Sequence, residues 1–133
     1  KYCIGGFMLK AAKILAVLAA IECFGIMALE MFFWQQSGTK IDPNMTADFV
    51  SQTATMAANQ GLYNGFLGLG IIFGMIRKNK EMILLSLFCI IAAAAYGAYS
   101  VDFAIIFKQG IIPAAAFIFN LIAREKRGTL RFR

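Results

Sequence analysis

Four apolar blocks of about 20 residues, joined by short polar links, constrain the fold of this chain most strongly; they run over residues 14–34, 55–76, 82–101 and 104–123. A hydrocarbon core about 30 Å thick is crossed by about 20 helical residues. Hydrophobic residues make up 60% of the 133 residues, which exceeds the roughly 45–50% of an ordinary soluble domain. The sequence therefore predicts an all-α membrane protein, a single domain over 1–133 in which four transmembrane helices pack as an up-down bundle.

The basic residues predict the orientation of these spans. Three lie in the N-terminal segment, three in the link 77–80 and five in the tail 124–133, whereas the other side has only Lys40 and Lys108. Because Lys and Arg accumulate in cytoplasmic loops, both termini are expected in the cytoplasm and loop 35–54 on the outer side of the cell membrane. A signal peptide is the alternative for the first block, but this block is longer than the usual apolar segment of about 7–15 residues. We interpret it as a retained span.

Four residues, Asp42, Pro43, Pro113 and Trp34, predict local structure. Asp42 followed by Pro43 is typical of a helix start, with Asp as the N-cap and Pro as the first helical residue. The second helix is thus expected to begin near Pro43 and to rise above the membrane. Pro113 has no N–H to donate to the carbonyl of Gln109, so a kink is expected there. Trp34 is expected at the outer interface, which favours amphipathic rings.

The stretch 59–66 places three amides and a phenol at the outer end of the second span. Amides in hydrocarbon are costly unless they are satisfied. At 100° per residue, an arc of about 140° contains all four groups, namely Asn59, Gln60, Tyr63 and Asn64. Gly61, Gly65 and Gly68 form a separate strip, while Gly70 and Gly74 lie below the polar arc. Such glycines either admit a neighbouring helix closely or leave a cavity that continues from the polar end, and both interpretations stay open.

Two carboxylates lie inside the first span. A carboxylate at the centre of a span costs about 2.5–3.5 kcal/mol on insertion scales, so each should face the bundle, protonated or hydrogen-bonded. Glu30 lies at the depth of the amides and is expected to join them, either as part of a site or as a structural link between helices. Glu22 lies nearer the middle without an obvious partner, which favours a proton or ion site. Gln109 is expected in the same outer layer, where Lys108 either pairs with Glu30 or Asp102 or extends to the interface.

Several classes of chemistry are excluded or disfavoured. The chain has no histidine, which excludes His-based catalysis and His-ligated metals within it. Cys3, Cys23 and Cys89 form no close pair, so neither a metal site nor a disulfide framework is expected. No cofactor is expected. The basic tail is explained by the membrane orientation and by attraction to anionic lipid, so the lipid bilayer is the expected partner and nucleic acid is not.

Three strings of residues resemble one known family. They are Leu29-Glu30-Met31-Phe32-x-Trp34, then Ala58-Asn59-Gln60-Gly61-Leu62-Tyr63-Asn64-Gly65-Phe66-Leu67, then Gln109-Gly110-x-x-Pro113-Ala114. In this order they resemble the bacterial integral-membrane family catalogued as domain of unknown function 1304, over nearly the whole chain. The resemblance implies a small four-span bacterial membrane protein without an assigned activity. It marks as motif positions Glu30, Trp34, Asn59, Gln60, Tyr63, Asn64, Gln109 and Pro113.

Three functions are compatible with the sequence. The first is the binding or transport of a small polar or amphipathic molecule through an outward-facing pocket, with Glu22 as a deeper proton or ion site and ligand-binding residues Glu30, Asn59, Gln60, Tyr63, Asn64 and Gln109. Four spans are few for a transporter, so a homodimer through the glycine faces is expected. The second is an intramembrane enzyme that modifies a lipid or isoprenoid, with Glu30 or Glu22 as general acid or base. No nucleophile–base pair is visible, which favours a role without catalysis. The third is an accessory or structural membrane subunit.

Overall fold

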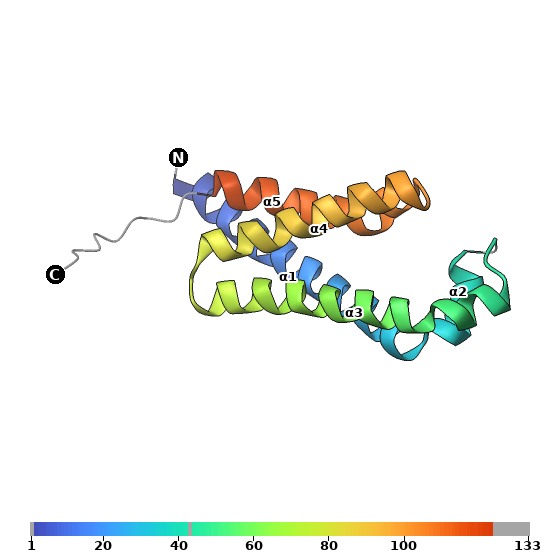
Figure 1. Ribbon diagram of the computed structural model, residues 1–133. Helices are drawn as coiled ribbons and strands as arrows, with labels where there is room; N and C mark the ends of the chain where they lie inside the picture. Colours follow the sequence, from blue (N-terminus) through green and yellow to red (C-terminus); the bar gives the residue numbers. More distant parts are fainter. Residues whose placement is uncertain (1, 43, 124–133) are drawn as a thin grey trace.

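A computed structural model describes residues 2–42 and 44–123, with side chains from residue 6 onward in these ranges. All regular structure in this part of the chain is helical (Figure 1), which confirms the predicted all-α class. The elements are α1 (Tyr2–Phe32), α2 (Trp34–Ile41), α3 (Ala47–Ile76), α4 (Lys80–Ser100), the π-helix η1 (Ile106–Gly110) and α5 (Ile111–Ile122).

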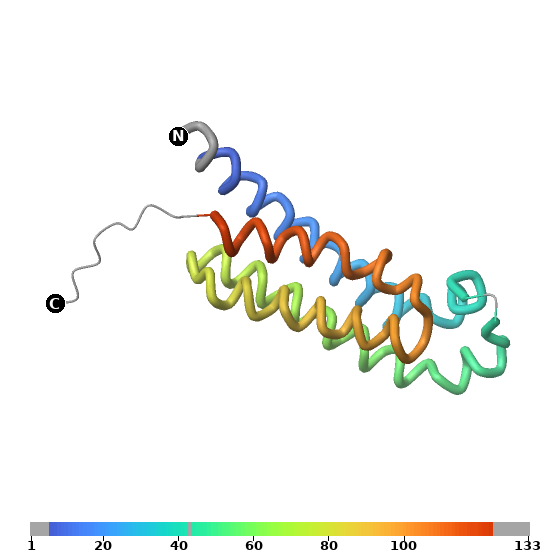
Figure 2. Tube along the Cα trace, turned by 90° about the horizontal axis from the view of Figure 1, so that it is seen from above, coloured from blue at the N-terminus to red at the C-terminus, as the bar shows by residue number. Residues whose placement is uncertain are grey.

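The long helices form a bundle in which each helix packs against two neighbours. Helix α1 packs against α3 and α5, and α4 packs against the same two helices from the other side. The start of α1, the 77–79 turn and the end of α5 lie together at one end of the molecule (Figure 2), which we name the inner end. Helix α2 and the 101–105 turn lie at the opposite, outer end. The predicted basic tail 124–133 is outside the described residues.

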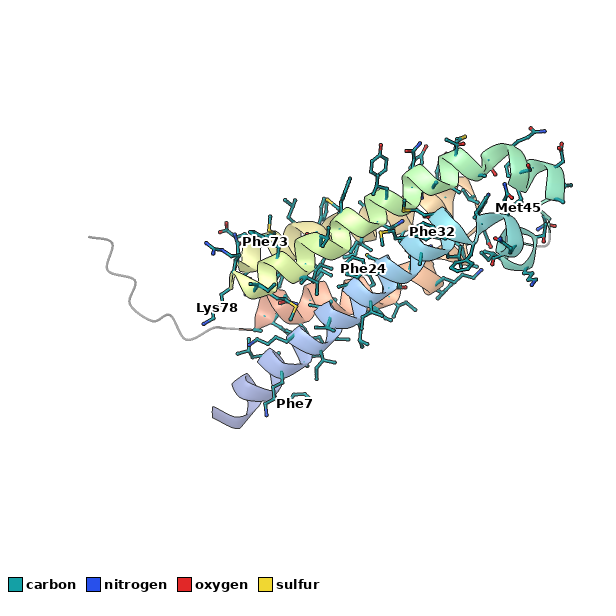
Figure 3. The ribbon with its side chains drawn as sticks, turned by 90° about the horizontal axis from the view of Figure 1, so that it is seen from below. Phe7, Phe24, Phe32, Met45, Phe73 and Lys78 are labelled. Atoms are coloured by element: carbon teal, nitrogen blue, oxygen red, sulfur yellow. The ribbon has the colours of Figure 1, made fainter. Side chains whose placement is uncertain are left out.

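The core combines many alanines with a few large apolar side chains such as Ile71 and Leu87, while other large apolar residues are exposed on the outside. The completely buried residues of α1 include Ala12 and Ala19, and they face α5, whose Ala116 is also fully buried. By contrast Phe7, Phe32 and Phe73 project from the surface (Figure 3), each more than half exposed. Large apolar side chains are exposed on every long helix in addition to the apolar core, which gives this surface more apolar area than that of a usual soluble monomer.

Two helical segments of the described chain are long and apolar enough to cross a membrane, Gly6–Phe32 and Lys80–Ser100. The segment Ile106–Ile122, which joins η1 and α5, is apolar but shorter. Helix α3 has sufficient length, at 30 residues, but the amides at 59–64 lower its apolar character. The four predicted spans thus differ in how strongly their composition supports them.

The outer region differs from the sequence prediction. The sequence predicted an outer loop over 35–54 with the second helix beginning near Pro43; the structure contains the additional helix α2 and the first turns of α3 in this region. Helix α3 begins at Ala47, and its N-cap is Thr46, whose hydroxyl accepts from the Phe49 amide at 3.2 Å. The predicted start at Asp42 is wrong, because Asp42 is the C-cap of α2 and its carboxylate accepts from the Asn44 amide at 2.9 Å. Pro43, the other half of that prediction, lies outside the described residues.

The predicted irregularity before Pro113 is present. Residues Ile106–Gly110 form a single π-helical stretch, and Pro113 is buried in the first turn of α5. A proline leaves the carbonyl four residues earlier without its usual donor, and a widened turn is a common response to such a loss. This stretch contains Gln109, so its backbone is set by the proline.

Candidate functional site

The glycine strip Gly61/Gly65/Gly68 joins α3 closely to α1. A Cβ added at Gly61 would lie 3.0 Å from Cβ of Glu30 and 3.1 Å from the main-chain oxygen of Met27. At Gly65 it would collide with Met27 Sδ, and at Gly68 it would lie 3.2 Å from Phe24, which sits where α1 and α3 meet (Figure 3). These glycines therefore serve packing within the chain, as small residues do between membrane helices.

The two glycines further along α3 pack against α4. A Cβ at Gly70 would collide with the hydroxyl of Ser86, and one at Gly74 would lie 2.8 Å from Ile83 Cγ1 and 3.1 Å from the Asn79 oxygen. The cavity considered below the amides is therefore absent at Gly70 and Gly74, because α4 fills that space. A homodimer stays a prediction, and it would need a surface other than these two glycine faces.

The α3–α4 contact closes at the inner end and opens at the outer end. Gly70 and Ser86 are in contact, and Ser86 is only 7% exposed. Tyr63 lies seven residues before Gly70 on the same face of α3, and Ala93 lies seven residues after Ser86 on the same face of α4. Tyr63 is 62% exposed, and Ala93 is also exposed. Figure 1 shows the two helices diverging toward α2. We give the name outer seam to the exposed positions on the same helix faces as Gly70 and Ser86, which are Asn59, Tyr63, Ala93 and Ser100.

Side-chain size explains why the seam opens. At Gly70 and Gly74 the α3 face has no side chains, so α4 approaches closely and the 77–79 turn is short. Asn79 caps α4 by accepting from the Met82 amide at 3.1 Å, which fixes this inner junction. About two and three turns beyond Gly70, the same face carries Tyr63 and Asn59 in place of glycine, so the helices have no small-residue surface there that would allow an equally close approach. The helix pair α3–α4 is therefore closely packed at the inner end and more widely separated at the outer end.

Glu30 and Asn64 form the polar link at the α1–α3 junction. The Asn64 amide Nδ2 lies 3.5 Å from Glu30 Oε2 and 3.3 Å from the main-chain oxygen of Gln60. Both Glu30 and Asn64 are half-buried. Asn64 lies about 100° around α3 from Tyr63. The Glu30–Asn64 link and the outer seam therefore lie on neighbouring faces of α3. The predicted association of Glu30 with the amide stretch is present here through Asn64.

The other predicted site residues are distributed more widely. Asn59, Gln60 and Tyr63 expose their side chains at the outer end. Gln109 is half-buried in η1, which packs against α4 and α5 rather than against the α1–α3 junction. Glu22 is half-buried, and its Oε2 is a buried oxygen without a hydrogen-bond partner among the described residues. Depth alone placed Gln109 with Glu30, but their helices face different neighbours.

Two polar contacts were not anticipated from the sequence. The buried Asn120 donates its amide to the main-chain oxygens of Ala12 at 3.2 Å and Ala116 at 2.8 Å, which links α5 to α1. Trp34, expected at the interface only, donates to the Val50 oxygen and the Thr53 hydroxyl. A polar residue in an apolar span was the available signal for Asn120, whereas nothing near Trp34 marked its partners.

The family model described as "Protein of unknown function (DUF1304)" matches residues 17–121. The chain belongs to this family. The DUF1304 match includes Glu30, Asn64 and the whole outer seam, and it confirms the resemblance noted in the sequence. The chain is also similar to the uncharacterized protein YpaA of Lactococcus lactis subsp. lactis (strain IL1403), with 36% identity over 109 residues, or 79% of this chain and 92% of that protein. No solved structure matches the chain.

Proposed function

We propose that this DUF1304 protein crosses the cell membrane four times, through α1, α3, α4 and the joined η1–α5, with both termini in the cytoplasm. Two helices of sufficient length and apolar character support this topology. So do the exposed large side chains of the remaining segments, among them Leu69 and Phe73 of α3 and Ile118 and Leu121 of α5, each more than half exposed. Apolar surface this extensive is rare on soluble monomers.

Cysteine labelling tests the topology. In a chain whose native cysteines are replaced by serine, Thr39→Cys lies on the exposed outer helix α2 and Lys78→Cys lies in the inner turn. A membrane-impermeant maleimide applied to intact cells should label Thr39→Cys, and should label Lys78→Cys only after permeabilisation. Labelling of both positions in intact cells, or recovery of the protein in the soluble fraction, would exclude the topology.

We further propose that the protein binds or transports a small amphipathic molecule in an outer opening, defined as the space between the outer seam and the Glu30–Asn64 link. The observation that carries this proposal is the divergence of α3 and α4, in contact at Gly70–Ser86 and exposed at Tyr63–Ala93. The exposed amide of Asn59 and the exposed ring of Tyr63 lie on one face of α3, a combination that suits a molecule with a polar head and an apolar body. The buried Oε2 of Glu22 supports its assignment as a deeper proton or ion site.

Ligand-dependent stabilisation tests the opening. The purified full chain is heated in detergent micelles with a panel of metabolites and lipids, and the midpoint of thermal unfolding is compared with that of Asn64→Ala. A true ligand should raise the midpoint of the wild type and have little effect on Asn64→Ala. Gln36→Ala is the matched control, because Gln36 is an exposed amide on α2 and its loss should leave the ligand effect intact. If every compound affects wild type and Asn64→Ala equally, the opening is not a binding site.

A further inference from the structure

One face of the outer half of α3 is left uncovered by the other described helices. Its members recur at alternating intervals of three and four residues over 49–66, and at 100° per residue they share an arc of about 100°. This arc lies on the side of α3 opposite the glycines that contact α1. We name this face the outer stripe; all its members are exposed, and they are Phe49, Gln52, Met56, Asn59, Tyr63 and Phe66.

In the proposed topology, the outer stripe exposes polar and apolar groups to unsuitable surroundings. Asn59 lies about 26 Å along α3 from Ile76 at the inner end, which is within a hydrocarbon core about 30 Å thick. Its exposed side chain has no hydrogen-bond partner among the described residues. Met56 and Phe49 lie about 30 and 40 Å from Ile76, at and beyond the outer boundary of the core, and both are at least half exposed. A partner over the whole stripe would remove the amide from lipid and the apolar side chains from water.

The chemistry of the stripe suits a second copy of the same chain. Between Asp48 and Arg77 the sequence has no charged residue, so two copies of this face can meet without charge repulsion. An amide is both a hydrogen-bond donor and an acceptor. The side chain of Asn59 can therefore pair with its own copy across a twofold axis, where identical surfaces face each other.

The exposed area of the stripe is sufficient for a dimer. Its four largest side chains, Phe49, Met56, Tyr63 and Phe66, are 50%, 72%, 62% and 55% exposed. A large aromatic side chain has about 150–250 Å² of surface, so each contributes about 100 Å², and the stripe with its two amides offers about 500 Å² per copy. Two copies would bury about 1,000 Å² in total, which is the lower limit for a specific interface.

We propose that the protein forms a parallel homodimer in which the outer stripes of two copies pack together and the two Asn59 amides pair on the twofold axis. Two chains of the same topology, related by an axis normal to the membrane, present parallel α3 helices. The alternation of three and four residues is typical of such pairs, in which a single Asn fixes the register. The parallel orientation rests on the proposed topology. Because Asn59 and Tyr63 also belong to the outer seam, the proposed ligand would lie beside the dimer interface.

Disulfide cross-linking in native membranes tests the interface at two depths. In a chain whose native cysteines are replaced by serine, Met56→Cys and Tyr63→Cys place single thiols on the stripe. The matched controls are Ser51→Cys and Leu62→Cys, since both positions are exposed and lie about 90–110° around α3 from the centre of the stripe. Oxidation with copper phenanthroline should give at least fivefold more cross-linked dimer from the stripe positions. Equal yields at all four positions would indicate random collision, and cross-links to a different protein would show that a second copy is not the partner.

Energy transfer between full-length chains tests the amide pair. Donor and acceptor dyes are attached through Thr39→Cys on α2, and association is measured in phosphatidylcholine vesicles at increasing ratios of protein to lipid. Asn59→Leu should weaken association at least threefold, because a hydrogen bond between membrane helices is lost, and the exposed position should leave the fold intact. Leu69→Ala, at an exposed position away from the stripe, should change association less than twofold. Equal association of wild type and Asn59→Leu, or no energy transfer at any ratio, would overturn the proposal.

The outcomes separate this dimer from the proposed function. If maleimide labels both Thr39→Cys and Lys78→Cys in intact cells, the topology is wrong and so is the parallel orientation. If the topology is correct but the stripe positions do not cross-link, only the dimer is wrong. A compound that then stabilises the wild type but not Asn64→Ala would show that the outer opening is a site of the single chain.

Discussion

The indole nitrogen of Trp34 donates to the main-chain oxygen of Val50 over 3.1 Å, so the first residue of α2 is bonded to the fourth residue of α3. The Thr53 hydroxyl lies 3.2 Å from the same nitrogen. The buried Val50 also covers Gly38, where an added Cβ would lie 2.8 Å from either Val50 methyl group. One aromatic ring and one glycine thus hold the outer helical hairpin together.

Replacement of Trp34 by Phe should loosen this hairpin. The ring remains, but the bonds to Val50 and Thr53 are lost, at a cost of about 1–2 kcal/mol for two hydrogen bonds. Amide hydrogen exchange in α2 should accelerate by roughly tenfold, while exchange in α5 stays as it was. Gln35→Ala, at the exposed neighbouring position, should have no such effect. Unaltered exchange of α2 in Trp34→Phe would show that packing alone holds the hairpin.

Gly74→Leu should destabilise the α3–α4 junction. The new side chain would meet Ile83 and the main-chain oxygen of Asn79, and overpacking of this kind costs about 1–3 kcal/mol. Gly25→Leu is the matched control, because a Cβ at Gly25 meets nothing within 4 Å and leucine favours the helix over glycine by somewhat less than about 1 kcal/mol. Thermal unfolding in micelles should separate the two variants in opposite directions. Equal midpoints would contradict the assigned packing role of Gly74.

Asn120→Leu should weaken the attachment of α1 to α5. The substitution keeps the side-chain volume but removes the donor to Ala12, and a hydrogen bond between membrane helices contributes about 0.6 kcal/mol on average and up to about 1.7. Amide exchange in the first half of α1 reports the change. Ser100→Ala, which removes only a bond to the Tyr96 oxygen in the same helix, serves as the comparison. A stability equal to that of wild type would mean that apolar packing around Ala116 suffices.

Lys80→Met should destabilise the end of α5. The Lys80 ammonium donates to the main-chain oxygens of Leu121 at 3.3 Å and Ala123 at 2.9 Å, and a cation at a helix C-terminus contributes about 0.3–1 kcal/mol. Lys78→Met removes the same charge from the adjacent turn without breaking a described bond. The expected difference is a lower unfolding midpoint in Lys80→Met alone, and it should persist at high salt because the contact is partly buried and buried contacts are screened less. Equal unfolding midpoints in the two variants would show that the Lys80 bonds do not stabilise α5, which would leave both lysines with a role only in the membrane orientation of the chain.

The sequence predicted what depends on local pattern. The helical class followed from the apolar blocks, and the position of the irregular backbone followed from Pro113, because both depend on residues close in the chain. The association of Glu30 with the amide stretch followed from depth along two adjacent helices. Helix α2 was missed because its sequence is polar and contains Gly38, which weakens helix propensity; tertiary contacts to Val50 and Trp34 stabilise it instead.

The features that were not predicted depend on which helix faces pack against each other, and the periodicity of a sequence does not give that information. Gln109 has the predicted depth but lies on a π-helix that packs against α4 and α5. Asp42 and Pro43 resemble a helix start as well as Thr46 does, and only the turn geometry favours Thr46. For Gly70 and Gly74 the sequence left packing and cavity equally open, because the partner residues Ser86 and Ile83 lie on another helix.

The contact between Gly70 and Ser86 lies far from the outer end of α3, so a change in helix angle at this contact would have its largest effect at that end. From Gly70 to Asn59 the helix extends about 16 Å, so a 10° change in the crossing angle of α3 and α4 would displace the outer tip by about 3 Å. That displacement is comparable to the thickness of an aromatic ring. The displacement grows in proportion to the distance from the contact, so a small change in helix angle at Gly70 becomes a larger shift at the outer end. Substitutions at Gly70 or Ser86 would therefore tune the width of the outer end without altering any residue that lines it.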